Sequence, residues 1–292
     1  MQTVMADHSK FRAQDPADSQ AAKNIIISGA ARGIGRCLAR TFLQKGHRVF
    51  IIDFDEQELN HCVNTHLKQF SSNVSSGLCN LRSITDIRAT VAKAARFFNN
   101  KIDVLINNGG IAAPQWKHGK TIEDEATFEE WQAYMETNLT APFAMSQACI
   151  PFMKVAVEKD KSSVTSLAGP CIIHVGSFRA HQSDPNQEGY ASTKAGQLGL
   201  MHSMAISLGP LGIRVNLIAP GRIKAAHESK AGDENGDTWE TSLEDRDLEQ
   251  HPVNRAGRPM DVYQAAEYLI DAGFVTGQDI TVDGGALRKK NT

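Results

Sequence analysis

The chain has 292 residues, of which 41% are hydrophobic and 22% charged, and its formal net charge is −2. This length is sufficient for one large α/β domain with a substantial core. The lysine and arginine residues are scattered, which disfavours a nucleic-acid partner, and no stretch reaches the roughly 18 apolar residues of a membrane span, so we expect neither nucleic acid nor a membrane as partner.

The first 22 residues are polar and lack the apolar core of a secretory signal. We therefore expect a flexible N-terminal extension over residues 1–22 and one domain over residues 23–292. The five cysteines lie far apart, without the spacing of a zinc site: Cys37, Cys62, Cys79, Cys149 and Cys171. They predict buried thiols in a reducing, cytoplasmic protein. The histidines show no ligand spacing either, so we expect no catalytic metal.

From residue 24 onward, short apolar runs alternate with segments of helical periodicity. The apolar runs cover residues 24–28, 48–53, 74–80, 102–108, 171–177 and 213–220, and a last strand lies within 276–285. Helical segments follow at 36–46, 54–70, 84–98, about 138–155 and 190–208. Continuous apolar strands separated by helices indicate a parallel sheet that is covered on both faces. The sequence predicts an α/β fold with a doubly wound parallel sheet of the Rossmann-like type.

Two segments interrupt this alternation. Residues 157–170 lengthen the connection into the strand at 171–177, and residues 225–259 form a long acidic stretch with few apolar side chains. The second segment follows the carboxyl end of a strand, where open α/β sheets bind ligands, and long loops there are often lids. We expect 225–259 to be a substrate lid, and its acidity disfavours a strongly anionic substrate.

Three glycines in "SGAARGIG", Gly29, Gly33 and Gly35, lie between the first strand and the first helix. Glycines allow a tight turn and close approach of the backbone to a pyrophosphate, while the helix N-terminus presents free N–H groups. The alternative is a tight strand-to-helix turn that binds nothing. The order of strand, glycines and helix favours a dinucleotide site.

Asp53 ends the second predicted strand, where a carboxylate accepts hydrogen bonds from an adenosine ribose and repels a 2′-phosphate. Arg32 lies inside the glycine turn and offers a guanidinium that pairs with such a phosphate. We give Asp53 the greater weight, because repulsion between like charges in a half-buried site is hard to offset with a flexible arginine. The expectation is NAD, with NADP as the alternative.

The segment "GYASTKAGQLGL" places Tyr190 and Lys194 one helical turn apart on one face. Taken alone, the pair is better explained by a surface tyrosine beside a lysine stem, because Y-x-x-x-K is a common pattern. Ser177 changes this interpretation, because it ends the predicted strand at 171–177 and precedes Tyr190 by 13 residues. A phenol beside an ammonium and a hydroxyl favours acid–base chemistry.

These motifs resemble the short-chain dehydrogenase/reductase family over residues 24–285. The resemblance rests on the glycine spacing G-x3-G-x-G, "NNGG" at 107–110, Asn138 in "ETNLTAPF", Ser177, the pair Tyr190 and Lys194, "APG" at 219–221 and "TGQDITVDGG" at 276–285. It implies a compact oxidoreductase that transfers a hydride between a nicotinamide cofactor and a secondary alcohol or ketone.

The resemblance also implies roles for individual residues. Tyr190 would be the general acid/base, Lys194 would lower its pKa and hold the nicotinamide ribose, and Ser177 would polarise the substrate oxygen. Asn138 would anchor a water linked to Lys194. The implied cofactor contacts are Gly29, Arg32, Gly33, Ile34, Gly35, Asp53, Asn80, Leu81, Asn107, Gly109, Tyr190, Lys194, Pro220, Gly221 and Ile223. A homotetramer or homodimer through the helices at 138–155 and 190–208 is typical of the family.

The sequence departs from the family pattern at three positions. Asn80 replaces the usual aspartate that contacts adenine, Gly109 replaces an alanine, and His174 occupies a position that often holds asparagine. We interpret His174 as a core histidine. Two alternatives to the dehydrogenase hypothesis are a nucleotide-binding regulator without turnover and a non-redox enzyme on the same fold; the intact set of Asn138, Ser177, Tyr190 and Lys194 argues against the first.

Overall fold

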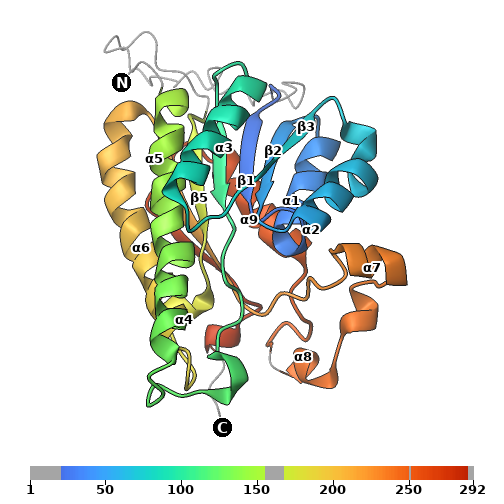
Figure 1. Ribbon diagram of the computed structural model, residues 1–292, viewed down its shortest axis with the longest axis vertical. Coiled ribbons are helices and arrows are strands. Elements are labelled where there is room, and N and C mark those ends of the chain that lie inside the picture. The colour runs from blue at the N-terminus through green and yellow to red at the C-terminus, as the bar shows by residue number, and fades with distance from the viewer. Residues whose placement is uncertain (1–20, 155–167, 250, 289–292) are drawn as a thin grey trace, which may run out of the picture.

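The computed structural model describes residues 21–154, 168–249 and 251–288 (Figure 1). Most of the expected N-terminal extension, and most of the connection at 157–170, lie outside the described residues. The described part of the chain forms a sheet with helices on both faces, and the candidate functional residues gather along one edge of that sheet.

Seven parallel strands form the sheet in the order β3-β2-β1-β4-β5-β6-β7. The strands are β1 (Asn24–Ser28), β2 (Arg48–Asp53), β3 (Val74–Leu78), β4 (Val104–Asn107), β5 (Cys171–Val175), β6 (Arg214–Pro220) and β7 (Asp279–Val282). β4, β5 and β6 are buried along their whole length, which explains their continuous apolar sequences. The doubly wound parallel α/β fold expected from the sequence is confirmed.

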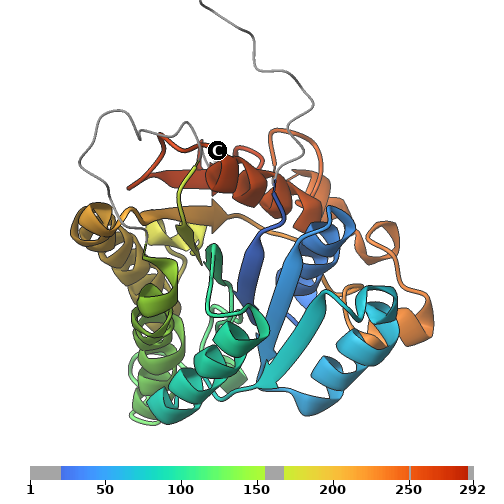
Figure 2. The ribbon, with the colours of Figure 1, turned by 90° about the horizontal axis from the view of Figure 1, so that it is seen from above.

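Helices cover both faces of the sheet (Figure 2). α1 (Gly33–Gln44) and α9 (Pro259–Asp271) pack on one face, and α3 (Ile84–Phe97), α5 (Ala141–Met153) and α6 (Glu188–Leu208) pack on the other. Successive residues of a strand face opposite sides, so Ile25 and Ile27 belong to the core under α1, and Ile26 belongs to the core under α3 and α5. α4 (Thr127–Tyr134) leads into α5 through a π-helical stretch, Met135–Thr140.

The helix expected over 54–70 is interrupted. α2 (Glu56–His61) is followed by a π-helical stretch, Cys62–His66, and a short 3-10 turn, Lys68–Phe70. Val63, Asn64 and Thr65 lie at the break, and residues of these types have weak helix propensity. The apolar spacing of this segment correctly predicted that it is helical. The prediction of one continuous helix was wrong.

The acidic segment at 225–259 contains two short helices, α7 (Lys230–Asn235) and α8 (Asp245–Glu249). In Figure 1 α7 lies near the end of α2, on the side of the molecule that carries β2 and β3. Among the described residues, no helix combines the length and the apolar character that crossing a membrane requires.

Candidate active site

The candidate residues lie at the carboxyl edge of the sheet. Gly29 follows β1, Asp53 ends β2, Ser177 follows β5 and Gly221 follows β6. All seven strands are parallel, so their carboxyl ends lie along one edge. The order of connections reverses between β1 and β4, and ligands of open α/β sheets bind outside the strand ends at such a point.

The glycine turn packs backbone against backbone. Gly29 and Gly33 both adopt φ +62°, a left-handed conformation that favours glycine. A Cβ on Gly29 would lie 2.6 Å from the Cα of Gly109, so neither loop has room for a side chain there. Asn108 Nδ2 donates to the carbonyl oxygens of Ser28 at 3.1 Å and Gly29 at 2.8 Å. The loop after β4 therefore supports the turn after β1.

Leu81 accounts for the unusual glycine at position 109. A Cβ on Gly109 would lie 2.6 Å from Leu81 Cδ1, so the leucine occupies the space that the common alanine would need. Asn80, which replaces the family's aspartate, is exposed, and its Oδ1 accepts a hydrogen bond from Arg82 N at 3.0 Å. Asn80 and Leu81 lie in the loop directly after β3, and Leu81 contacts the loop that packs against the glycine turn.

The N-terminus of α1 offers free donors. Gly33 N–H donates to the carbonyl oxygen of Glu228 at 2.6 Å. The N–H groups of Ile34 and Gly35, by contrast, meet no acceptor within the part of the chain that the structure describes. Unpaired N–H groups and the positive end of the helix dipole favour an anion. These groups fit a dinucleotide pyrophosphate.

Asp53 is buried and holds the glycine turn in place. Its carboxylate accepts hydrogen bonds from Ala31 N at 3.0 Å, Phe54 N at 2.8 Å and Asp55 N at 3.3 Å. A carboxylate offers about four lone-pair positions, so capacity for a ribose hydroxyl remains. The Arg32 side chain is 52% exposed and lies 3.9 Å from the Asp55 carboxylate, where it forms a surface ion pair.

The side chain of Asn107 faces the core between β4 and α5. The amide is buried and donates to Ser146 Oγ at 3.2 Å and to Pro142 O at 3.4 Å, and it lies 3.3 Å from His174 Nδ1. The side chain therefore joins β4 to α5 and β5. His174 is fully buried, and burial lowers its pKa to about 4, as befits a neutral core histidine.

Ser177, Tyr190 and Lys194 lie together at the ends of β5 and α6. Lys194 Nζ lies 5.6 Å from the centroid of the Tyr190 ring and donates to the carbonyl oxygen of Val175 at 3.0 Å. Ser177 Oγ accepts from Arg179 N at 3.1 Å, and the serine side chain acts on the Tyr190 phenol by lowering its pKa. The three groups that the sequence analysis singled out thus share one site.

The pKa of the Tyr190 phenol is raised, whereas the sequence led us to expect a lowered value. Burial is the dominant cause, because it disfavours the charged phenolate. The hydrogen bond from Ser177 and the positive charge of Arg179 lower the pKa and offset burial in part. Burial also lowers the pKa of Lys194, to about 8.

Two aromatic side chains that the sequence analysis missed fix the position of Tyr190. The Tyr134 ring lies edge-on at 6.4 Å between centroids, and Trp116 lies 5.7 Å beyond Tyr134. Trp116 Nε1 donates to Glu188 Oε2 at 2.8 Å. A Cβ on Gly189 would lie 2.7 Å from both rings, so only glycine fits beside them. This glycine next to Tyr190 was the only feature of the sequence that could have indicated the aromatic packing.

Asn138 lies in the π-helical stretch before α5 and is fully buried. Its side chain accepts from Ile111 N at 2.7 Å and donates to Ile111 O at 3.2 Å. Its carbonyl oxygen accepts a hydrogen bond from the side-chain amide of Gln197, which lies three residues after Lys194 on α6. Sequence analysis missed Gln197, although a glutamine among small and apolar helix residues was a visible sign.

The segment after β6 is held by backbone contacts. Gly221 N donates to Val282 O at 2.9 Å, and a Cβ on Gly221 would lie 2.8 Å from the Cα of Asp283. Ile223 pairs with Gly257 in an isolated parallel bridge, and Pro220 is buried at the end of β6. Residues 220–223, which the sequence analysis named as cofactor contacts, thus lie in a segment whose backbone is held by hydrogen bonds and close packing. Among the described residues, no group of three or more His, Cys, Asp or Glu side chains is arranged to hold a metal ion.

Comparisons with known proteins agree with this arrangement. The family model described as Enoyl-(Acyl carrier protein) reductase matches residues 29–286. The 7α-hydroxysteroid dehydrogenase of Escherichia coli is 31% identical over 271 residues, which cover 92% of this chain and 96% of that protein. The 3-oxoacyl-(acyl-carrier-protein) reductase of Thermotoga maritima is 29% identical over 267 residues, which cover 91% and 98%.

A solved structure shares the fold over nearly the whole chain. It is a 7α-hydroxysteroid dehydrogenase in complex with NADH and 7-oxo glycochenodeoxycholic acid, with a TM-score of 0.73 and 29% identity, covering 92% of this chain and 96% of that one. The parallel sheet, the glycine turn at its carboxyl edge and these similarities lead to one conclusion. The chain belongs to the short-chain dehydrogenase/reductase family and is an NAD(P)-dependent oxidoreductase.

Proposed function

We propose that the protein interconverts a secondary alcohol and a ketone, with Tyr190 as the general acid/base. The observation that carries this proposal is the grouping of Ser177, Tyr190 and Lys194 at the edge of the sheet that also holds the free N–H groups of α1. A nicotinamide dinucleotide, when bound, supplies the hydride acceptor or donor and, in its oxidised form, a positive charge. The chain's own residues handle the proton and the position of the substrate.

Tyr190 removes the hydroxyl proton of the substrate during oxidation and returns it during reduction. Ser177 Oγ accepts from Arg179 N, and with substrate bound its own proton turns from the Tyr190 phenol toward the substrate oxygen, where it stabilises the charge that develops. Lys194 contributes positive charge near the phenol and holds the nicotinamide ribose. Since burial alone raises the pKa of Tyr190, such positive charge is what brings the phenol into the range of a useful base.

Asn138 has a positioning role in this proposal. It joins the loop after β4 to α6, because its side chain bonds the backbone of Ile111 and its carbonyl oxygen accepts from Gln197. The second lone pair of that carbonyl is available for a water that connects Lys194 with solvent. The register of α6, and with it the placement of Tyr190 and Lys194, depends on these bonds.

The preferred cofactor in this proposal is NAD. The buried Asp53 carboxylate at the end of β2 repels a 2′-phosphate, and Arg32 already pairs with Asp55 rather than standing free. The other proposed contacts are the backbone of the glycine turn, the loop with Asn80 and Leu81, and residues 220–223. We propose that Asn107 contributes through its backbone, because its side-chain nitrogen is bonded to α5.

The similar proteins narrow the substrate to a carbon-bound hydroxyl or keto group. One relative is named for a hydroxysteroid and another for a 3-oxoacyl group, so both classes belong among the first candidates. We propose residues 225–259 as the substrate lid of one domain that begins at residue 23. Most acidic groups of the lid that the structure describes take part in ion pairs, so the acidity of the lid says little about the charge of the substrate.

We also propose a homotetramer or homodimer in the cytoplasm. Phe143 on α5 is 49% exposed and Ile206 on α6 is 81% exposed, so both helices present apolar surface to their outer side. The five cysteines are free and buried, consistent with a reducing compartment.

A substrate panel tests the proposed function. Purified protein is incubated with NAD or NADH and a set of hydroxysteroids, 3-oxoacyl thioesters, sugars, polyols and cyclic ketones, and the absorbance of the reduced nicotinamide is followed. We expect turnover with at least one secondary alcohol or ketone, and its loss in Tyr190→Phe. Tight nucleotide binding without turnover across the panel would instead favour a nucleotide-binding regulator.

A further inference from the structure

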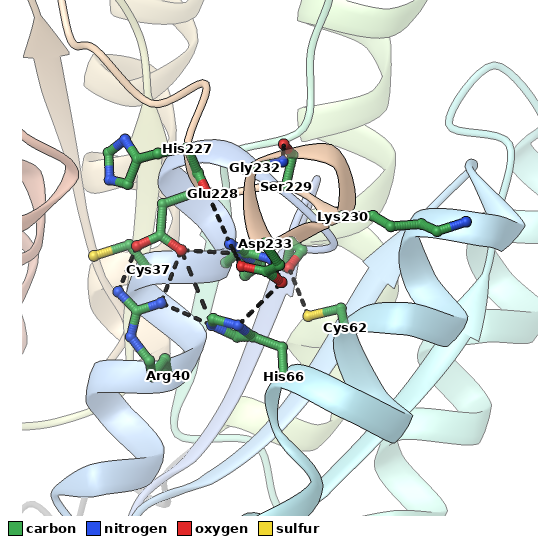
Figure 3. Close-up of polar contacts among 12 residues, drawn as sticks. Cys37, Arg40, Cys62, His66, His227, Glu228, Ser229, Lys230, Gly232 and Asp233 are labelled. Carbon is green, nitrogen blue, oxygen red and sulfur yellow. Dashed lines mark hydrogen bonds and ion pairs between the residues drawn. The ribbon is translucent and has the colours of Figure 1, made fainter. Parts of the chain in front are cut away.

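A buried arginine connects α1 with the lid. Arg36 is 1% exposed, although it is the fourth residue of α1 and carries a charge. Its Nε donates to Glu228 Oε2 at 3.0 Å, and its two terminal nitrogens donate to Asp233 at 2.7 and 3.0 Å. Figure 3 shows the two carboxylates approaching the helix from the lid side. The contact joins residues 192 positions apart in the sequence.

A second arginine binds the same glutamate from the next turn of α1. Arg40 Nη1 donates to Glu228 Oε2 at 2.8 Å and Arg40 Nη2 to Oε1, so the pair is bidentate. Arg40 Nη1 also lies 2.7 Å from His66 Nε2. His61 Nε2 reaches Asp233 at 2.8 Å. α1 thus binds both lid carboxylates, and His61 at the end of α2 binds Asp233. Figure 3 shows Arg40 beside Glu228.

The charges of this cluster balance. Two guanidinium groups face two carboxylates, and burial together with the nearby arginines lowers the pKa of His66, which disfavours its charged form. Buried charges are tolerated only when they are paired, so removal of one partner leaves an uncompensated charge. The cluster therefore specifies a single docked position for the residues that carry Glu228 and Asp233.

The backbone continues this contact to the glycine turn. Glu228 O accepts from Gly33 N at 2.6 Å, and the Cβ of Ala225 lies 4.0 Å from the position that a Cβ on Gly33 would take. Lys230 N donates to Glu58 Oε2 at 3.0 Å, which ties the start of α7 to α2. Residues 225–228 thus lie against Gly33 in the glycine turn. The free N–H groups of Ile34 and Gly35 follow directly in the sequence.

We propose that Arg36, Arg40, Glu228 and Asp233 form an ion-paired clasp that holds residues 225–235 across the pyrophosphate-binding turn and sets the rate at which the dinucleotide leaves. The inference rests on the proposed function, since it takes the glycine turn as the nucleotide site. The four side chains are positioning residues, because they act through the backbone of 225–228. Departure of the nucleotide past this segment requires the clasp to open, and such opening steps often limit turnover.

The rest of the lid has a separate anchor. Asp247 is fully buried and pairs with Arg222 at 2.9 Å and with Lys224 at 2.9 Å, close to the end of β6. Gly236, with φ +71°, lies between the two anchored parts. The two parts of the lid are therefore held by different contacts, so loss of the clasp leaves the anchor at Asp247 in place.

The test measures the release of NADH from the full chain by rapid displacement with excess NAD. Glu228→Gln keeps the shape of the side chain and removes its charge, and Asp233→Asn does the same at a less buried position. We expect release to accelerate about tenfold in Glu228→Gln, which corresponds to the loss of one charge-assisted hydrogen bond. The rate of hydride transfer in a single turnover at saturating NADH should stay at the wild-type value, because the clasp does not touch the reacting groups.

A matched control lies at the other end of α1. Glu267→Gln removes the ion pair between Glu267 on α9 and Lys45, the residue that directly follows α1. We expect its release rate to match the wild type. Hydrogen exchange of residues 225–235 without nucleotide provides a second measurement, and we expect faster exchange in Glu228→Gln and Asp233→Asn than in Glu267→Gln.

Each outcome decides the proposal. Wild-type release rates in both clasp variants overturn it, whether or not their thermal stability falls, since a merely structural cluster would change stability alone. If Glu228→Gln does not fold, Asp233→Asn decides by the same criterion. If the wild-type protein binds no dinucleotide, both the proposed function and the proposed control of nucleotide release are refuted. In that case the hydrogen exchange of residues 225–235 still shows whether the ion pairs hold this segment in place.

Discussion

The ammonium nitrogen of Lys194 lies 5.6 Å from the centroid of the Tyr190 ring and donates a hydrogen bond to the carbonyl oxygen of Val175 at 3.0 Å. The lysine is almost fully buried, and burial lowers its pKa to about 8. The charge that the proposed chemistry requires is therefore held at a cost to folding. Function and stability oppose each other at this residue.

Substitution of Lys194 by methionine should remove activity and raise the free energy of unfolding. The pKa of the lysine falls from 10.5 to about 8 on folding, so between these values the unfolded chain binds more protons and wild-type stability rises with pH. We expect Lys194→Met to be inactive but more stable than wild type at pH 7, by on the order of 3 kcal/mol. The difference should shrink as the pH approaches 10.5. Urea unfolding at several pH values measures it, and a less stable variant at pH 7 would contradict the cost assigned to the buried ammonium.

Arg179 should tune the pH dependence of activity. Its positive charge lowers the pKa of the Tyr190 phenol, and it pairs with Asp184. We expect Arg179→Met to move the rising limb of the pH profile for alcohol oxidation to higher pH, because the phenolate loses a favourable neighbour. Asp184→Asn, which leaves the arginine unopposed, should move that limb to lower pH. If both variants moved the rising limb of the pH profile in the same direction, the charge of Arg179 would not be what sets the position of that limb.

The sheet and the candidate active site were largely predictable because their signals are local. Apolar runs gave the strands, and the spacing of Ser177, Tyr190 and Lys194 gave their grouping. The direction of the pKa shift of Tyr190 was not predictable, since it depends on how deeply the folded chain buries the phenol. The bonds of the Asn107 side chain to α5, and the pairing of Arg36 with Glu228, join distant segments that no local pattern relates.

Asp53 should control the choice of cofactor and also support the glycine turn. We expect Asp53→Asn to raise the affinity for NADP relative to NAD, because the charge that repels a 2′-phosphate is lost. The asparagine oxygen can still accept from one of the backbone donors, Ala31 N or Phe54 N, so stability should fall less than in Asp53→Ala. Fluorescence titrations with both nucleotides, with thermal melting of both variants, measure this. A wild-type preference for NADP would refute the role of Asp53.

Gly109 and Leu81 should behave as a coupled pair. An alanine at position 109 would place its Cβ 2.6 Å from Leu81 Cδ1, so the leucine must rotate away from the glycine turn. We expect Gly109→Ala to weaken nucleotide binding severalfold and to cost about 1 kcal/mol of stability. In the double variant with Leu81→Ala, Gly109→Ala should cost much less. Purely additive effects in this double-mutant cycle would exclude a steric conflict between the two positions.

The most direct test of the account is a single-turnover measurement on Tyr190→Phe. The substitution removes the phenolic oxygen and leaves the aromatic packing against Tyr134 in place. We expect nucleotide affinity close to that of the wild type and a rate of hydride transfer reduced by about 10²-fold or more, the range in which general acid–base groups contribute. A transfer rate within a few-fold of the wild type, with nucleotide bound, would contradict the assignment of Tyr190 as the group that moves the proton.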